Sequence, residues 1–173
     1  RAALSDLEMQ ITGEYRRHMI QSEILAEDIS DNKIKNGRRN YEIQISVETV
    51  EQLKLALSKE YINRIFVSDA IAFDETVIDM LEEYHLNMRD KKCESKICLA
   101  MPYIFRERAM NIYKVYFEKI CHYYEGVLVR NWEALEWMKS KGYKGEILSD
   151  YNLYGWNNRA IKELSELGIE QYT

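Results

Sequence analysis

The stretch "GVLVRNWEALEWMKSKGYKGEILSD", residues 126–150, decides the fold class. Its two ends, "GVLV" and "EILS", are short apolar runs rich in Val, Ile and Leu, as buried strands are. The segment between them, "WEALEWMKSKG", has a helical pattern and closes on Gly142, where a helix C-terminus favours a residue at positive φ. A strand, a helix and a second compact apolar strand indicate parallel strands covered by helices.

The same alternation runs through the chain from Tyr41 onward. Thr49 is the expected N-cap of the first helix, and Gly168 should end the last one. Strands are predicted at 41–47, 64–70, 96–104, 126–131, 146–150 and from 169, and helices at 50–59, 74–86, 106–124, 132–142 and 158–168. The fold class is therefore α/β with about six parallel strands. A doubly wound open sheet and part of an eight-stranded barrel both fit, and both place function at the carboxyl ends of the strands.

Residues 1–40 differ from this domain of residues 41–173. They are helical in pattern and end in the polar, basic stretch "KIKNGRRN" at 33–40. A solvated linker is the expected role of that stretch, with an RNA contact as the alternative. The chain starts at Arg1 and stops inside a predicted strand, so we expect a piece of a longer protein with the barrel-like domain truncated at its C-terminus.

Composition narrows the class of protein. No run approaches the roughly 18 apolar residues that span a bilayer, and no basic-then-apolar leader is present, so a cytoplasmic protein without membrane contact is expected. The net charge of −5 disfavours a nucleic-acid clamp. The odd number of cysteines, without zinc-type spacing, predicts reduced thiols and no metal; Cys98 on a strand and Cys121 on a helix are expected to be small buried hydrophobes, with Cys93 in a loop.

Polar side chains follow several of the predicted strands, and parallel strands bring such residues to one rim. Asp and Asn there can hydrogen-bond a polar ligand, and Arg130 can pair with a carboxylate or phosphate. The candidate substrate-binding residues are Asp69, Tyr103, Arg130, Asp150, Asn152 and Asn157. Asp and Asn after a strand also cap helices, which is the expected role of Asn131. Whether Asp150 lines a polar pocket or only orders its loop through backbone amides and Arg130 stays open.

The sequence contains no self-contained catalytic set, so the catalytic residues are unknown. Ser68 and Ser149 precede acidic residues, but no histidine is placed to activate either one. A nucleophile elbow, a P-loop and a Gly-rich dinucleotide turn are all missing. Tyr113 is expected to pack against the sheet, whereas Tyr151 and Tyr154 join Tyr103 as an exposed aromatic rim.

Three blocks of the sequence together resemble the U32 family of collagenase-like peptidases, in the later portion of its longer bacterial members. "ISVETVEQLKLAL" with "INRIFV" resembles the family's strand–helix–strand opening. "GVLVRN", "DYNLYGWNN" and "ELGIEQYT" resemble, in order and spacing, its strand ending in "LVRN", its "D-Y-x-L-N" motif and its "LG" before the next strand. The family's Asn after "D-Y-x-L" is Tyr154 here, with Asn152 and Asn157 nearby as substitutes.

The resemblance implies a TIM-like (β/α) barrel and an enzyme family. Its label is peptidase, yet better-understood members resemble oxygen-independent hydroxylation factors acting on RNA bases or a quinone precursor. Several members hold an iron–sulfur cluster on later cysteines that this chain lacks, so no cofactor is expected here and a cluster belongs to the complete protein. Its partners would be the parent's other domains and a protein or RNA substrate. The alternative is a non-catalytic barrel module that binds substrate or a partner for another domain.

Overall fold

The computed structural model describes residues 42–88, 95–155, 157–169 and 171–172. The chain divides into two units between Asn40 and Tyr41, and every described residue belongs to the second. The predicted helical segment at 1–40 and the predicted loop position of Cys93 therefore lie outside the described residues.

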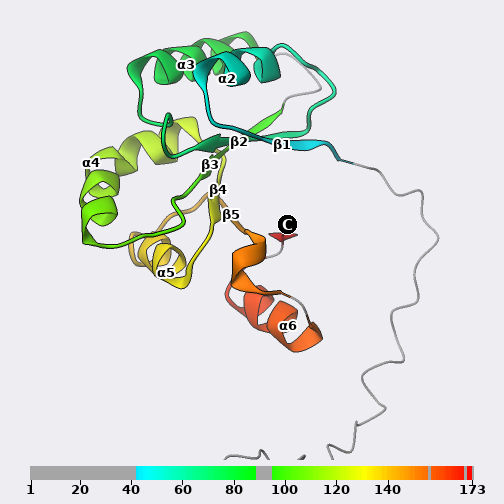
Figure 1. Cartoon of the computed structure of the whole chain (residues 1–173), viewed down its shortest axis with the longest axis vertical. Coiled ribbons are helices and arrows are strands. Elements are labelled where there is room, and N and C mark those ends of the chain that lie inside the picture. Colours follow the sequence, from blue (N-terminus) through cyan, green and yellow to red (C-terminus); the bar gives the residue numbers. More distant parts are fainter. Residues whose placement is uncertain (1–41, 89–94, 156, 170, 173) are drawn as a thin grey trace, which may run out of the picture. The chain divides into compact units, whose positions relative to one another are not determined.

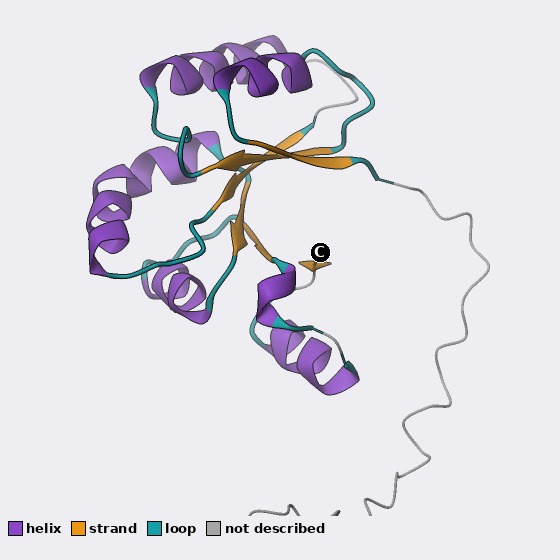
Figure 2. Cartoon of the chain, viewed as in Figure 1, coloured by secondary structure: helices purple, strands orange, loops and turns teal. Residues whose placement is uncertain are grey.

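Strands and helices alternate through the described part of the chain (Figure 2). The alternation follows the apolar runs and helical patterns of the sequence, and the α/β class predicted from them is confirmed. The elements are β1 (Gln44–Val47), α2 (Val50–Leu57), β2 (Arg64–Ser68), α3 (Glu75–Met88), β3 (Lys96–Ala100), α4 (Glu107–Tyr123), β4 (Gly126–Val129), α5 (Trp132–Ser140), β5 (Glu146–Ser149), the 3₁₀ turn η2 (Tyr151–Leu153), α6 (Asn158–Glu166) and the two-residue β6 (Gln171–Tyr172).

The strands pair in parallel in the order β1-β2-β3-β4-β5-β6. Each strand lies beside the next one in the sequence, so this order has no reversal of the kind that a doubly wound sheet needs. Right-handed crossovers that always step in one direction place every helix on the same face. Figure 1 shows that arrangement, with α2 to α6 outside a curving sheet. A parallel sheet of this kind is consistent with part of a (β/α) barrel.

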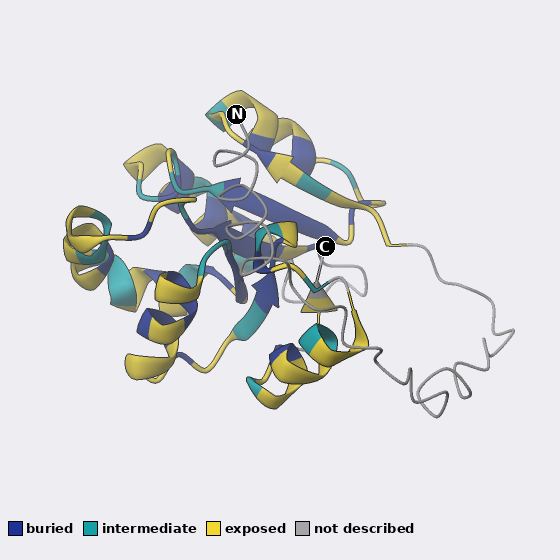
Figure 3. Ribbon diagram, turned by 60° about the horizontal axis from the view of Figure 1, so that its bottom comes forward, coloured by how far each residue is buried: buried dark blue, intermediate teal, exposed yellow. Residues whose placement is uncertain are grey.

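Alternate residues of the strands β2 to β5 belong to two apolar clusters. One set faces the helices and joins the main core with residues such as Leu53, Leu81 and Leu135. The other set lies on the opposite face and consists of Phe66, Cys98, Ala100, Leu128 and Leu148. Figure 3 shows the buried strands against helices whose outer sides are exposed. Strands buried on both faces explain why the sequence shows continuous apolar runs instead of polar alternation.

Helix ends follow the capping pattern read from the sequence. Thr49 accepts a hydrogen bond from the Gln52 amide at the start of α2, and Asn131 accepts one from Ala134 at the start of α5. Gly142 and Gly168 have φ of 70° and 78° after α5 and α6. These cap predictions are confirmed, and they fix where each connection leaves the sheet.

The two described cysteines differ in burial. Cys98 is fully buried in β3, as expected, and burial raises the pKa of its thiol to about 12. Cys121 is exposed, so its prediction as a buried hydrophobe is wrong. It follows the buried Ile120 by one residue, and about 100° of helical rotation turns it away from the sheet. In the part of the chain that the structure describes, no helix has the length and apolarity to span a membrane.

Candidate functional site

The backbone pairing of the sheet continues one residue beyond several strands and brings their polar successors to one edge. Asp69 N donates to Ala100 O at 3.1 Å, and Asp150 N donates to Val129 O at 2.9 Å. Asp69, Tyr103, Arg130 and Asp150, which we name the carboxyl-edge cluster, follow β2, β3, β4 and β5. Parallel pairing therefore gathers four residues that are far apart in the sequence, as the strand-end rule predicts.

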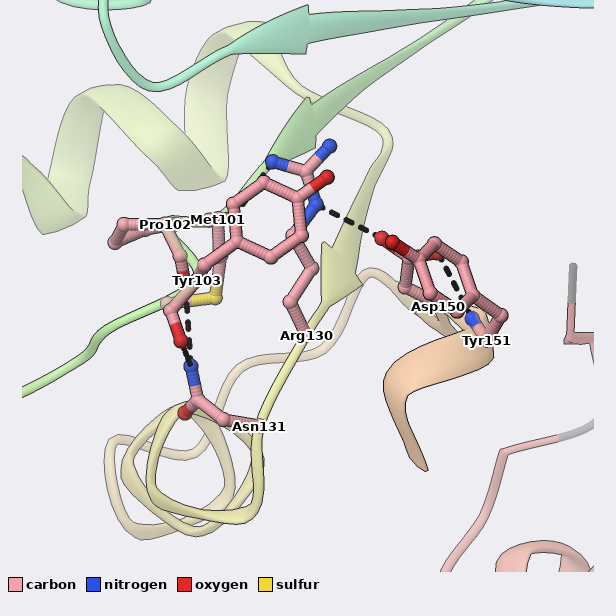
Figure 4. Close-up of polar contacts among 7 residues, drawn as sticks. All are labelled: Met101, Pro102, Tyr103, Arg130, Asn131, Asp150 and Tyr151. Carbon is pink, nitrogen blue, oxygen red and sulfur yellow. Dashed lines mark hydrogen bonds and ion pairs between the residues drawn. The ribbon is translucent and has the colours of Figure 1, made fainter. Parts of the chain in front are cut away.

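Arg130 is the centre of the carboxyl-edge cluster (Figure 4). Its Nε donates to Asp150 Oδ2 at 2.9 Å, and its Nη1 donates to Met101 O at 3.3 Å. The Tyr103 ring lies over the guanidinium with 4.2 Å between Cζ and the ring centroid, a cation–π contact. Among the described residues Nη2 has no hydrogen-bond partner. Two nitrogens of the guanidinium are therefore bonded within the protein, and Nη2 remains available to donate to a ligand.

Asp150 has a structural role in this cluster. Oδ2 accepts from Arg130, and Oδ1 accepts from the Tyr151 amide at 2.8 Å, which caps η2. The Arg130 and Asp150 side chains are only 11% and 8% exposed. This geometry matches the loop-ordering alternative for Asp150. Its prediction as a substrate-binding residue stays a prediction, and its evident effect is to aim Arg130.

The loop after β3 is fixed by Asn131. Asn131 Nδ2 donates to the carbonyls of Pro102 and Tyr103, each at 3.1 Å, while Oδ1 caps α5. One side chain thereby ties the start of α5 to the loop that carries Tyr103. Since Tyr103 itself is 57% exposed, this tie places its ring over Arg130 without burying it. The exposed rim expected of Tyr103, Tyr151 and Tyr154 is confirmed.

Asp69 is half-buried beside the cluster. Burial raises the pKa of its carboxyl above the ordinary value of 3.8, and the positive charge of Arg130 and a backbone hydrogen bond only partly offset that rise. A carboxyl group with a raised pKa lies nearer to gaining a proton at mildly acidic pH than an exposed aspartate does.

Among the described residues, no hydrogen bond joins the two candidate asparagines to the carboxyl-edge cluster. Asn152 is in η2, where its Nδ2 atom is buried and has no hydrogen-bond partner. Asn157 is the N-cap of α6 and accepts from the Ala160 amide at 2.9 Å. Their roles in substrate binding remain predictions, and the contact seen for Asn157 is structural.

A second polar feature at this edge was not predicted. Tyr113 on α4 is 2% exposed, as its packing role requires, yet its buried hydroxyl has no hydrogen-bond partner. Tyr113 and Asp69 line a hollow of about 350 Å³ next to the first turns of α4. Helical spacing shows that Tyr113 faces the sheet, but it cannot show that the hydroxyl would lack an acceptor.

The serine and histidine side chains considered as catalytic groups form no catalytic set among the described residues. Ser149 is buried, and His85 and His122 are on the helices α3 and α4. Within the described ranges no group of three or more His, Cys, Asp or Glu residues is placed to hold a metal. Buried Cys98 and exposed Cys121 do not fit the ligand set of an iron–sulfur cluster.

Comparison of the chain with models of protein families gives no match, and comparison with curated proteins gives none. The function of the carboxyl-edge cluster is therefore inferred from its chemistry and from the "LVRN" and "DYNL" motifs of the sequence. These motifs contain two members of the cluster, Arg130 and Asp150.

Proposed function

We propose that this chain is part of a U32-family collagenase-like peptidase and forms most of a TIM-like (β/α) barrel that binds the substrate. The consecutive parallel strand order supports the barrel, and a closed (β/α)₈ barrel needs eight strands, more than the six of this sheet. The remaining strands and the catalytic groups would then lie in other parts of a longer, cytoplasmic protein.

The observation that carries the proposal is the held and partly open guanidinium of Arg130. Asp150 and Met101 O fix its direction, and the exposed Tyr103 ring covers its face. A guanidinium edge donates well to carboxylate and peptide carbonyl oxygens, and an adjacent aromatic ring gives apolar contact. An extended peptide presents both kinds of group, so it is the substrate class that this edge suits best.

The reaction assigned to the complete protein is peptide hydrolysis, with RNA-base modification as the competing reaction of the family. Hydrolysis needs an activated nucleophile or a metal-bound water. The chain alone is therefore expected to bind gelatin peptides without cleaving them.

A non-catalytic binding module is the second candidate. It is favoured because Arg130 and Asp150 bond to each other, an arrangement that suits recognition better than proton transfer. The two candidates predict the same binding by the isolated chain. They separate when the complete protein is assayed for cleavage of gelatin.

Binding is tested by titrating the purified chain with gelatin-derived peptides and following amide NMR shifts. Tyr103→Ala should weaken peptide binding, while Tyr61→Ala, which removes a tyrosine of similar exposure (63%) before β2, should not. Equal binding by both variants, or tighter binding of single-stranded RNA than of peptide, would refute a peptide substrate. Steady cleavage of gelatin by the chain, after contaminating protease is excluded, would contradict the proposal that this chain binds substrate while the catalytic groups lie in other parts of the protein.

A further inference from the structure

The N-terminus of α4 differs from the other helix starts in lacking a side-chain cap. Its N-cap residue, Arg106, has extended backbone and makes no capping hydrogen bond. The first intrahelical bond reaches only Met110 N, which donates to Arg106 O at 2.8 Å. The amides of residues 107–109 therefore point out of a 17-residue helix with no partner among the described residues. Such amides, together with the helix dipole, favour an anion.

The charges at this helix start are mixed but favour an anion. Arg106 and Arg108 are exposed and line the hollow next to α4. Glu107 in the first turn opposes them, which leaves a net charge of +1 at the rim from two arginines and one glutamate. Asp69 adds a half-buried carboxyl to the lining of the hollow. An anionic group of the ligand is therefore expected at the rim and not beside Asp69.

The lining of the hollow combines apolar side chains with polar groups. Phe73, Pro102, Ile104 and Ile112 contribute apolar wall. Ile104 is 73% exposed, so its side chain is available to a ligand in the hollow. Asp69 and Tyr113 also line the hollow, and the buried hydroxyl of Tyr113 has no hydrogen-bond partner among the described residues. That hydroxyl is independent evidence for a missing hydrogen-bonding group, because a buried polar atom without a partner is costly.

We propose that this hollow binds a carboxylate-bearing apolar group, such as the C-terminal residue of a peptide. The carboxylate meets the free amides of α4 with Arg106 and Arg108, and the apolar side chain enters between Phe73 and Ile104. A polar atom of the last peptide unit reaches the Tyr113 hydroxyl. The volume of about 350 Å³ suits a single residue. The identification of the ligand as a peptide end rests on the proposed function.

Three small probes test the class of ligand by calorimetry and amide NMR on the purified chain. N-acetyl-L-leucine should bind about tenfold more tightly than N-acetyl-L-leucinamide, which lacks the carboxylate. It should also bind more tightly than acetate or inorganic phosphate, which lack the apolar side chain. Equal binding of the acid and the amide would overturn the proposal, and so would binding of phosphate without a preference for N-acetyl-L-leucine.

Variants at the helix start separate binding from stability. Arg106→Asn supplies a capping side chain that occupies the same amides, so the thermal midpoint should rise by about 2–8 °C while probe binding is lost. Arg106→Gln should weaken binding without that rise, and Glu107→Gln should strengthen binding by removing the opposing charge. Arg159→Gln is the matched control, because Arg159 is an exposed arginine of α6; this substitution should change neither probe binding nor the thermal midpoint.

Tyr113→Phe tests the polar part of the hollow. It should weaken binding of N-acetyl-L-leucine while leaving the fold at least as stable, because it removes an unpartnered buried hydroxyl. Full probe binding in Arg106→Asn would overturn the site at the helix start. If gelatin peptides still bind to Arg106→Asn and lose affinity only in Tyr103→Ala, this inference fails while the proposed function stands.

Discussion

Two arginine–carboxylate pairs lie at opposite ends of the same sheet. At the carboxyl edge Arg130 Nε lies 2.9 Å from Asp150 Oδ2. At the amino ends of the strands Arg64 Nη2 lies 3.2 Å from Glu146 Oε2, and Lys96 Nζ lies 3.4 Å from the same oxygen. The residue types are alike, but the surroundings of the two guanidinium groups differ.

The amino-end arginine is the more deeply buried and the less well bonded of the two. Arg64 is 3% exposed, and its Nε and Nη1 atoms are buried without hydrogen-bond partners. Arg130 has donors engaged on two sides and an aromatic ring over its face. A buried charged donor without an acceptor destabilises the folded state, whereas an oriented and partly open one can recognise a ligand. The comparison therefore supports the proposed binding role of the carboxyl edge and identifies a structural weakness at the amino end.

The largest expected effect is that of Asp150→Ala. The substitution leaves the Arg130 charge largely buried without its counter-ion and removes the cap of η2. A loss of about 3–5 kcal/mol in the free energy of unfolding is expected, measured by urea denaturation. Asp150→Asn keeps a capping oxygen, so its free energy of unfolding should fall by less than that of Asp150→Ala. A loss below about 1 kcal/mol in Asp150→Ala would mean that the pair contributes little to the fold.

A matched pair of substitutions sharpens the comparison between the two ends. Arg64→Met removes two unpartnered donors and leaves Glu146 paired with Lys96, so the stability should change by less than about 1 kcal/mol in either direction. Arg130→Met leaves Asp150 buried without its guanidinium and should cost about 3 kcal/mol. If denaturation shows the same loss of unfolding free energy for Arg64→Met and Arg130→Met, the proposed difference between the two arginines is wrong.

The sequence predicts the sheet well because its information is local. The apolar runs at β2 to β5, the cap at Asn131 and the turn at Gly142 each depend on near neighbours. Parallel alternation then brings Arg130 and Asp150 to one edge, as predicted. The unpartnered Tyr113 hydroxyl could not be predicted, because it depends on which hydrogen-bond partners are absent after folding. The missing cap of α4 was predictable, because no Ser, Thr, Asp or Asn directly precedes this helix.

A smaller effect is expected at Tyr154, which holds a left-handed backbone conformation with φ 54° and ψ 48°. Such a conformation is strained for tyrosine and is better tolerated by Asn. Tyr154→Asn should therefore raise the free energy of unfolding by about 1 kcal/mol, measured by thermal and urea denaturation. A clear loss of stability would show that contacts of the tyrosine ring outweigh the backbone strain. At the amino end of the sheet, positive φ occurs among the described residues at Gly142 and Gly168, where glycine adopts it without this strain.

The smallest effect concerns the pH dependence contributed by Asp69. Because burial raises the pKa of this carboxyl above 3.8, the folded state binds a proton more tightly than the unfolded state does. The resulting stabilisation is fully present below 3.8 and is lost as the pH rises through the folded-state pKa. The difference in unfolding free energy between the natural chain and Asp69→Asn should therefore fall as pH rises from about 3 to about 6.

Asp79→Asn provides the matched control, because Asp79 is an exposed residue of α3. Denaturation of the three proteins at each pH isolates the contribution of Asp69, since the other carboxyl groups cancel in the differences. If the difference for Asp69→Asn rises with pH instead, Arg130 stabilises the ionised carboxylate more than burial disfavours it. Asp69 would then be a fixed negative charge beside Arg130. The net positive charge that the carboxyl edge presents to a ligand would be lower than with a protonated Asp69.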